Sequence, residues 1–164
     1  MDKALLDTDT FSEILKRVDK LVATRATEYR SQLGVYTIST ITVVEIVKGL
    51  HKVQREERLQ EFLKGLSAVE ILTLDLSSAE LAGRIYADLE RTGQPIGRAD
   101  PMIAAIAILN GLTLITGNAV HYRPTAAPAA GSDLSDGSPG WTLKYSRTSS
   151  CIRSISARNP ELAA

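Results

Sequence analysis

The sequence predicts an α/β protein whose central sheet is mainly parallel and is flanked by helices. Short apolar, β-branched stretches alternate with longer stretches of helical period along the first three quarters of the 164-residue chain. Residues 102–109 are almost wholly apolar and rich in alanine, and residues 112–116 form a β-rich apolar run after Gly111. A buried helix that leads through a tight turn into a buried strand is typical of α/β layers.

The first predicted strand is residues 3–6, which end in the polar sequence Asp7-Thr8-Asp9-Thr10. If the strand continued, Asp7 and Asp9 would project from the same side. The alternative is that Asp9 or Thr10 caps a helix that begins near Phe11, because both residue types are good N-caps. Residues 11–32 are amphipathic and charged, and they predict one or two surface helices.

A second strand is predicted at residues 35–40, and a helix follows it. Thr42 is a good N-cap, and Glu45 stands three residues later, which is the spacing of a capping box. In the other interpretation Glu45 lies in the first turn of that helix and points to the carboxyl edge of the sheet. Both interpretations stay open for this carboxylate.

The next segments continue the alternation of helices and strands. Residues 51–66 predict a charged helix, 69–74 a third strand, and 77–91 a helix that Gly93 ends. Asp100 precedes the alanine-rich helix, with Pro101 in the first turn that proline favours. Taken alone, Asp100 has the position of an N-cap, and other carboxylates at equivalent places in the fold would favour a functional role instead.

The composition changes abruptly after Tyr122. We expect one domain at residues 1–123, followed by an atypical and disordered tail at 124–164 that is rich in Pro, Ala, Gly, Ser and Arg. Within this tail only residues 141–145 could form a strand. One hypothesis is a shift of reading frame near Arg123.

Composition limits the cellular setting of the protein. The 19 basic and 19 acidic residues balance, so the net charge neither indicates nor excludes a nucleic-acid partner. The single cysteine excludes an internal disulfide framework and fits a reducing compartment. No segment has the pattern of a signal peptide or approaches the roughly 18 apolar residues that span a bilayer. We therefore expect a cytoplasmic protein without a membrane partner.

Three carboxylates stand at junctions between predicted strands and helices: Asp7, Glu45 and Asp100. In a parallel sheet these junctions lie along one edge, where ligands bind. Gathering three carboxylates there is unfavourable unless a cation neutralises them. Oxygen ligands favour Mg²⁺ or Mn²⁺ over Zn²⁺. Such an ion can activate water against a phosphodiester, so these residues predict a metal-dependent hydrolase.

Four short motifs together resemble the PIN domain, and within it the VapC-type toxins of prokaryotic toxin–antitoxin pairs. They are LLDTD with Asp7, S-x-x-T-x-x-E-x-x-x-G from Ser39 to Gly49, IGRADPMIAA with Asp100, and TGNAVHY with Thr116 and Asn118. The similarity spans residues 3–122. Each motif alone is weak, whereas four in the right order are fairly specific.

The resemblance implies a PIN-like three-layer fold with four or five strands and an endoribonuclease that uses Mg²⁺ or Mn²⁺. Its RNA substrate would be tRNA or rRNA, its inhibitor a cognate antitoxin in the active-site groove, and its assembly a homodimer. The implied metal ligands are Asp7, Glu45 and Asp100. Supporting residues would be Asp9 and Asn118, which complete the site, and Thr8, Ser39 and Thr116, which orient its side chains. Asn118 is a neutral ligand where the acidic version of the motif has Asp, so a second metal is not implied.

Two alternatives follow from the same residues. The sequence Asp7-Thr8-Asp9-Thr10 after a strand also occurs as the nucleophile motif of haloacid-dehalogenase-like phosphatases. That family needs a Lys and a later acidic pair after a strand, whereas the strand ending at Thr116 is followed by Gly117 and Asn118. The second alternative is a catalytically inactive PIN module that only binds RNA or protein.

Overall fold

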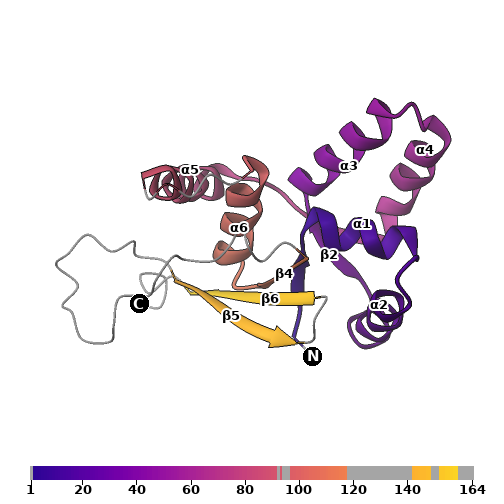
Figure 1. Cartoon of the computed structure of the whole chain (residues 1–164), viewed down its shortest axis with the longest axis horizontal. Coiled ribbons are helices and arrows are strands. Elements are labelled where there is room, and N and C mark those ends of the chain that lie inside the picture. The colour runs from indigo at the N-terminus through magenta and orange to yellow at the C-terminus, as the bar shows by residue number, and fades with distance from the viewer. Residues whose placement is uncertain (1, 92, 94–96, 118–141, 149–151, 159–164) are drawn as a thin grey trace.

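The computed structural model describes residues 2–91, 93, 97–117, 142–148 and 152–158. In chain order the elements are β1 (Ala4–Leu6), α1 (Thr8–Lys16), α2 (Lys20–Leu33), β2 (Tyr36–Ser39), α3 (Thr40–Lys52), α4 (Glu56–Gly65), the 3-10 turn η1 (Leu66–Ala68), β3 (Val69–Leu72), α5 (Leu76–Arg91), α6 (Ala99–Leu109), β4 (Thr113–Thr116), β5 (Thr142–Thr148) and β6 (Ile152–Arg158). Figure 1 shows their arrangement.

The strands form one sheet in the order β3-β2-β1-β4-β6-β5. The first four are parallel, with Leu5 of β1 opposite Thr37 of β2 on one side and Leu114 of β4 on the other. β6 pairs antiparallel with β4, and β5 pairs antiparallel with β6. The predicted α/β class with a mainly parallel sheet is therefore confirmed. The sheet has six strands instead of the expected four or five, because β5 and β6 extend it beyond β4.

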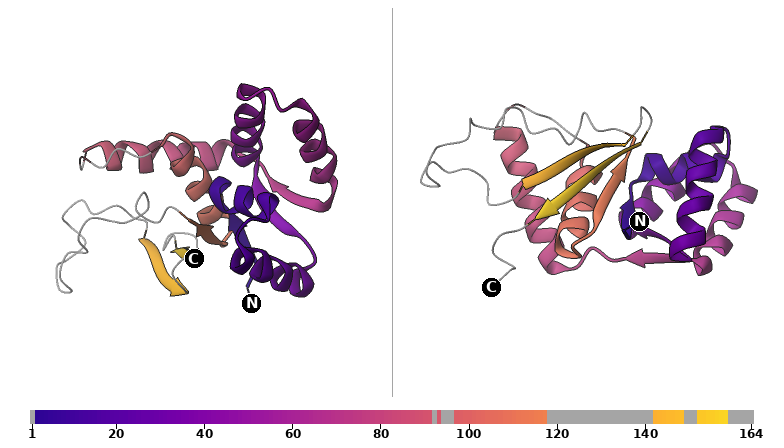
Figure 2. Two further views of the ribbon diagram at one scale, coloured as in Figure 1. Left: turned by 45° about the vertical axis from the view of Figure 1, so that its right-hand side comes forward. Right: turned by 90° about the horizontal axis from the view of Figure 1, so that it is seen from below.

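Helices cover both faces of the parallel part of the sheet. Side chains alternate along a strand, so the neighbours Leu5 and Leu6 enter different cores. Leu5 packs with Ile103, Ile106 and other residues of α6, whereas Leu6 packs with Phe11, Ile46 and Phe62 of α1, α3 and α4 (Figure 1). In both views of Figure 2, α5 and α6 lie on one side and α1 to α4 on the other, and α3 contacts α6. This arrangement is the predicted three-layer architecture.

α6 is buried on nearly all sides. Ala104, Ala105 and Ala107 are at most 1% exposed, because α6 lies between the sheet and the outer helix α5. Alanine allows the close approach of both layers, and a helix that is apolar all round belongs in a core. The prediction of a helix buried on most of its surface is confirmed.

Several predicted helix boundaries are wrong. α1 begins at Thr8 with Asp7 as its N-cap, so neither Asp9 nor Thr10 is the cap and the strand does not continue past Asp7. The predicted helix at 51–66 is divided between α3 and α4, with a break at Gln54, whose φ is 56°. The prediction of one or two helices within residues 11–32 is confirmed: they lie in two helices, because the left-handed Arg17 ends α1.

The expectation of a tail without regular structure is wrong for two stretches. β5 and β6 lie within residues 124–164, and β5 overlaps the stretch 141–145 that the sequence marked as a possible strand. Residues 118–141, 149–151 and 159–164 lie outside the described part of the chain, so the predicted boundary after residue 123 stays a prediction. Among the described helices, none combines the length and the apolar character needed to cross a membrane.

Candidate active site

The carboxyl ends of β1, β2 and β4 lie at one edge of the sheet because these strands are parallel. The residues at this edge are polar and buried: Asp7 directly after β1, Ser39 at the end of β2 and Thr116 at the end of β4. Polar groups are rarely buried without a hydrogen-bond partner. The hydrogen-bond partners of these three side chains therefore determine which of their oxygen atoms could bind a ligand.

Asp7 connects the ends of two strands. Its Oδ1 accepts a hydrogen bond from the backbone N–H of Thr10 at 2.9 Å, which caps α1. Its Oδ2 accepts a hydrogen bond from the hydroxyl of Thr116, which lies far away in the sequence. The backbone N–H of Asp7 donates to Ile115 O at 3.0 Å. These contacts hold the carboxylate in one orientation between β1 and β4.

The negative charge of Asp7 is unfavourable in the folded protein. Burial raises the pKa of Asp7 above its usual value and outweighs the hydrogen bonds from Thr10 and Thr116, which lower it; the nearby charge of Asp9 raises it further. Asp7 is only 5% exposed, so little water solvates its negative charge. A cation beside this carboxylate would stabilise its charged form.

Glu45 reaches from α3 to α1. The hydroxyl of Thr8 donates to its Oε2 at 2.5 Å, in a partly buried position. The capping-box interpretation is wrong, because α3 begins at Thr40 and its N-cap is Ser39. Glu45 therefore lies beyond the first turn of α3, and its side chain contacts the residue that follows Asp7.

Ser39 has a structural role in the described contacts. Its Oγ accepts a hydrogen bond from the backbone N–H of Thr42 at 3.0 Å and lies 3.1 Å from the Thr42 hydroxyl. These contacts fix the start of α3 and thereby the helix that carries Glu45. An orienting effect of Ser39 on the candidate carboxylates would act through this cap.

Asp100 lies in the first turn of α6, whose N-cap position is Arg98, so the N-cap interpretation of Asp100 is wrong. Since α6 is joined to β4 by a turn of only a few residues, it runs back along the strand, and its first turn lies toward the carboxyl edge of the sheet. The carboxylate of Asp100 also lies close to Gly97: a Cβ at this glycine would come within 3.2 Å of Asp100 Oδ2.

The structure brings some of the predicted residues into contact and leaves others apart. Contacts are made by Asp7 with Thr116 and by Thr8 with Glu45. Asp9 is exposed in the first turn of α1, and Asn118 lies outside the described residues. Within the described part of the chain, no group of three or more acidic, histidine or cysteine side chains is placed so that it could hold a metal ion.

The donor chemistry of the edge nevertheless fits a hard divalent cation. The available side chains are carboxylates and hydroxyls, and Mg²⁺ takes oxygen ligands while keeping several of its own waters. Because of those waters, such an ion needs only one or two protein carboxylates. The prediction that Asp7, Glu45 and Asp100 share one ion stays a prediction.

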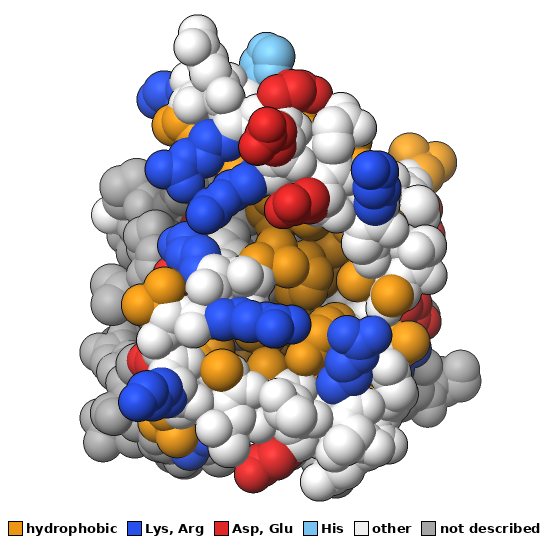
Figure 3. All heavy atoms as spheres, turned by 90° about the vertical axis from the view of Figure 1, so that its right-hand side faces the viewer, with side chains coloured by type: hydrophobic (Ala, Val, Ile, Leu, Met, Phe, Trp, Pro, Cys, Tyr) orange, Lys and Arg blue, Asp and Glu red, His pale blue; other side chains and the backbone are white. Residues whose placement is uncertain are grey.

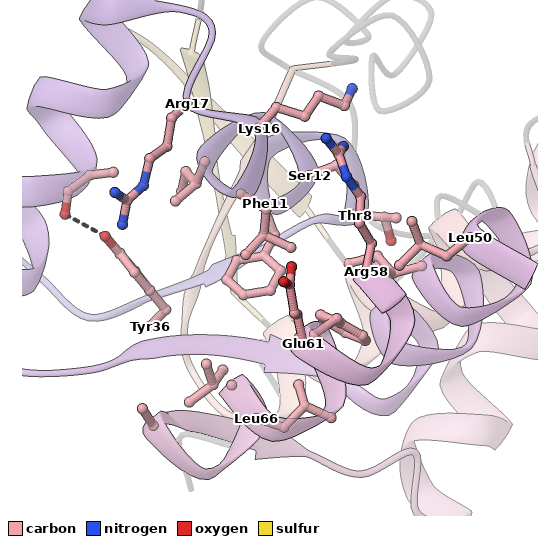
Figure 4. A pocket seen from close by; sticks show the side chains of 18 of the residues that line it. Thr8, Phe11, Ser12, Lys16, Arg17, Tyr36, Leu50, Arg58, Glu61 and Leu66 are labelled. Atoms are coloured by element: carbon pink, nitrogen blue, oxygen red, sulfur yellow. Dashed lines mark hydrogen bonds between the residues drawn. The ribbon is translucent and has the colours of Figure 1, made fainter. Parts of the chain in front are cut away.

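A deep groove opens beside this edge, with a volume of about 1060 Å³. Its floor includes Phe11, Ile46 and Phe62 of α1, α3 and α4, and Figure 3 shows the apolar hollow with basic side chains around it. The basic lining residues are Lys16, Arg17, Arg30, Arg55 and Arg58. In Figure 4, Arg58 and Glu61 extend from α4 toward α1.

Thr8 and Glu45 also line the groove, so the groove reaches the candidate site.

Sequence reasoning missed the roles that two residues have in this region: it considered Thr10 only as a possible cap, and it gave Gly97 no role. The backbone of Thr10 binds Asp7, and its hydroxyl donates to Ile115 O at 3.3 Å. Gly97 leaves space for the Asp100 carboxylate. The role of Thr10 could have been recognised from its position three residues after Asp7, an acidic residue able to cap a helix. The role of Gly97 could have been recognised from its position three residues before Asp100.

Comparisons with known proteins found a family match, similar sequences and similar structures. The sequence matches the PIN domain family over residues 4–126. It is 34% identical to the tRNA(fMet)-specific endonuclease VapC of Shigella flexneri, over 75% of this chain and 92% of that protein. It is 33% identical to Ribonuclease VapC2 of Haemophilus influenzae, over 77% and 95% of the two chains. The fold matches the DNA-bound VapBC structure from Salmonella typhimurium with a TM-score of 0.64 and 32% identity, over 74% of this chain and 91% of that chain.

Proposed function

The chain belongs to the PIN domain family, and from this membership we propose that it is a VapC-type toxin that hydrolyses phosphodiester bonds in RNA. The main support is its similarity to VapC nucleases over three quarters of the chain. The buried pair of Asp7 and Thr116 at the carboxyl edge of the sheet supports the same conclusion, because it places an oriented carboxylate where α/β proteins bind ligands.

We assign the metal-binding role to Asp7, Glu45 and Asp100, with Mg²⁺ or Mn²⁺ as the ion. Such an ion, when bound, polarises the phosphoryl oxygen and lowers the pKa of a bound water. Asp9 and Asn118 would complete the site, and Thr8, Ser39 and Thr116 would orient its side chains.

The residues of the chain supply orientation. Thr116 and the backbone of Thr10 each hold one oxygen of Asp7, so that the carboxylate does not rotate away from the edge. Thr8 holds one oxygen of Glu45. Preorganised groups of this kind need no reorganisation when the substrate binds. Basic side chains beside the site, such as Arg55 and Arg58, would bind phosphates of the RNA. The relative from Shigella flexneri makes a tRNA the first substrate to test, and rRNA the second.

The proposed protein partner is a cognate antitoxin. Solved relatives are VapBC complexes, and the groove of this chain has the apolar floor and charged rim that an amphipathic segment requires. Its basic residues favour a segment with acidic side chains beside its apolar face. Because Thr8 and Glu45 line the same groove, a bound segment would also block access to the site. We propose a homodimer as the assembly of the toxin.

The decisive experiment is cleavage of labelled RNA by the purified chain. We expect cleavage with Mg²⁺ or Mn²⁺ and none with EDTA. Asp7→Asn and Asp100→Asn should each abolish cleavage with the fold retained. Asp88→Asn, at a half-buried position of α5 where the carboxylate pairs with Arg91, should cleave like the wild type. Equal activity in EDTA, or in the two site variants, would contradict the proposal.

The two alternatives make different predictions. An inactive PIN module would bind RNA or antitoxin without metal-dependent cleavage. A phosphatase of the haloacid-dehalogenase type would form a covalent phosphate on Asp7. The family match favours neither, and in this structure both oxygens of Asp7 already accept hydrogen bonds.

A further inference from the structure

Gly49 lies within helix α3, where glycine is less favourable than alanine because it loses more backbone freedom on folding. A Cβ built at this position meets no atom within 4 Å, so the packing of the chain leaves room for a side chain. Gly49 is not among the described residues with a positive φ, so its backbone conformation does not require glycine either.

The end of α3 does not explain this glycine. Glycine commonly follows the C-cap of a helix, where the backbone turns left-handed. In α3 the C-cap is Val53, and the left-handed residue after it is Gln54, with a φ of 56°. Gly49 lies more than one turn before that position. Nothing in the described packing or backbone of the chain therefore accounts for the missing side chain.

The space beside Gly49 belongs to the groove, at the end where the groove reaches the candidate site. Gly49 lines the groove together with Thr8 and Glu45. Residues four apart share one face of a helix, so Gly49 lies one turn from Glu45, whose carboxylate accepts a hydrogen bond from Thr8 at 2.5 Å. A molecule bound beside Glu45 can therefore approach the backbone of α3 at Gly49 more closely than a side chain would allow.

The charge of the groove indicates which kind of molecule occupies this space. Basic side chains in the lining outnumber acidic ones, with Lys16, Arg17, Arg30, Arg55 and Arg58 against Glu45 and Glu61. Among the described residues, Arg17, Arg55 and Arg58 form no ion pair within the chain. Unpaired positive charge along a groove suits a polyanion such as single-stranded RNA.

We propose that Gly49 is a specificity-determining residue, whose missing side chain leaves room for the nucleotide beside the cleaved phosphodiester of the RNA. This inference rests on the proposed function, since it places the substrate in the same site. Gly49 takes no part in the chemical step. It lets the RNA lie against the backbone of α3, one turn from Glu45.

The test compares Gly49→Ala and Gly49→Leu with the wild type. Gly83→Ala and Gly83→Leu are the matched controls, because Gly83 is also an exposed glycine within a helix, α5, and a Cβ there also meets no atom within 4 Å. Gly83 does not line the groove. Each protein is measured for affinity for labelled tRNA in EDTA, for kcat/KM of RNA cleavage with Mg²⁺ or Mn²⁺, for binding of Mn²⁺ alone by calorimetry, and for unfolding in urea.

We expect Gly49→Ala to lower tRNA affinity and kcat/KM by at least about fivefold, and Gly49→Leu by roughly 100-fold, because the added carbons overlap the bound nucleotide. Mn²⁺ affinity should stay unchanged, since Glu45 keeps its contact with Thr8. Both alanine variants should unfold at a higher urea concentration than the wild type. The Gly83 variants should bind and cleave RNA like the wild type. A gain in stability with a loss of RNA affinity is expected only where the space serves a ligand.

The inference is overturned if both Gly49 variants keep a tRNA affinity within about twofold of the wild type, or if the Gly83 variants lose as much. A parallel loss of Mn²⁺ affinity would also overturn it, because the substitution would then act through Glu45. Intact tRNA affinity with weakened antitoxin binding would assign the space to the antitoxin instead. A wild type that binds tRNA but cleaves no RNA with either metal would overturn the proposed function, and the measurements in EDTA would still decide the role of Gly49.

Discussion

At the scale of single residues, Asp7 carries two roles that oppose each other. It caps α1 and binds Thr116, which stabilises the junction of β1 and β4. Its burial also raises its pKa, so that its charged form is unfavourable in the folded protein. An asparagine has the same shape and lacks the desolvation penalty of a charge. Its one carbonyl oxygen can accept from the Thr10 backbone N–H, and its amide N–H can donate to the Thr116 hydroxyl, which is able to accept as well as donate.

We therefore predict that Asp7→Asn is more stable than the wild type at pH 7 in the absence of metal. The sign follows from linkage: the folded-state pKa of Asp7 lies above its model value of 3.8, so protonation favours the folded state. As the pH falls through the raised pKa toward that value, the wild type gains stability from this group and the difference from Asp7→Asn shrinks. Urea unfolding of both proteins at several pH values measures this. A variant that is less stable than the wild type at pH 7 would show that the loss of the charged cap outweighs the relief of burial.

Gly97 provides the second prediction at this scale. A Cβ at this position would lie 3.2 Å from Asp100 Oδ2, so Gly97→Ala should displace that carboxylate by a few tenths of an ångström. Since a 1 Å misplacement can cost about 100-fold in rate, we expect roughly a 3- to 10-fold lower kcat/KM. Gly83→Ala is the control, because a Cβ there meets no atom within 4 Å. Equal activity of the two alanine variants would show that Asp100 tolerates the shift.

The sequence predicted Asp7 and Thr116 at the ends of two strands, but not their contact with each other. Asp7, Glu45 and Asp100 were selected because each lies at a junction between predicted elements, and their convergence on one ion stays a prediction. The capping roles were assigned to the wrong residues, since Asp, Ser and Thr are similar as N-caps and the sequence offers several within a few positions. Contacts such as Asp7 with Thr116 depend on the pairing of β1 with β4, which a local pattern does not contain.

At the scale of elements, α6 determines how closely the layers approach. Ile106 is 0% exposed and packs with Leu5 and Leu114 of the sheet. We predict that Ile106→Ala destabilises the fold by about 2–5 kcal/mol, because a cavity would open between the helix and the sheet. Val44→Ala, at a position 61% exposed on α3, should change stability by no more than about 0.5 kcal/mol. Urea unfolding of both variants provides the comparison, and similar losses would contradict the described packing.

The elements themselves were largely predictable, whereas their boundaries were not. The pattern of apolar residues along the sequence identified α6 and the four parallel strands. The helix predicted at 51–66 is in fact divided near Gln54, where a positive φ is adopted by a residue that gives no local signal for it. β6 pairs with β4, and a serine- and arginine-rich composition did not suggest a strand there.

At the scale of the whole molecule, the groove makes the antitoxin proposal testable. Arg58 lines the groove, whereas Lys64 lies on the same helix, α4, outside the lining. We predict that Arg58→Glu weakens antitoxin binding about tenfold, which corresponds to about 1.4 kcal/mol, and that this loss decreases with added salt. Lys64→Glu should bind like the wild type. Titration of each variant with the antitoxin measures the affinity, and equal weakening by both charge reversals would remove the groove as the specific binding surface.

The extent of the functional domain is a second question at this scale. The family match ends at residue 126, close to the boundary expected after residue 123. We propose that residues 1–123 form the domain that carries the activity. A chain truncated after residue 123 should still cleave RNA, but it should unfold at lower urea concentration, because β4 loses its pairing with β6. A truncated chain that is folded and inactive would place an essential residue in 124–164.

The burial of Asp7 has a consequence for selection in growing cells. If the chain is the toxin proposed above, a mutation that neutralises this carboxylate would abolish toxicity without producing a misfolded chain. Such an escape mutant would persist as an abundant, harmless protein with an intact groove. It would then sequester antitoxin from any active toxin in the same cell, so a disabled allele would sensitise its host instead of protecting it.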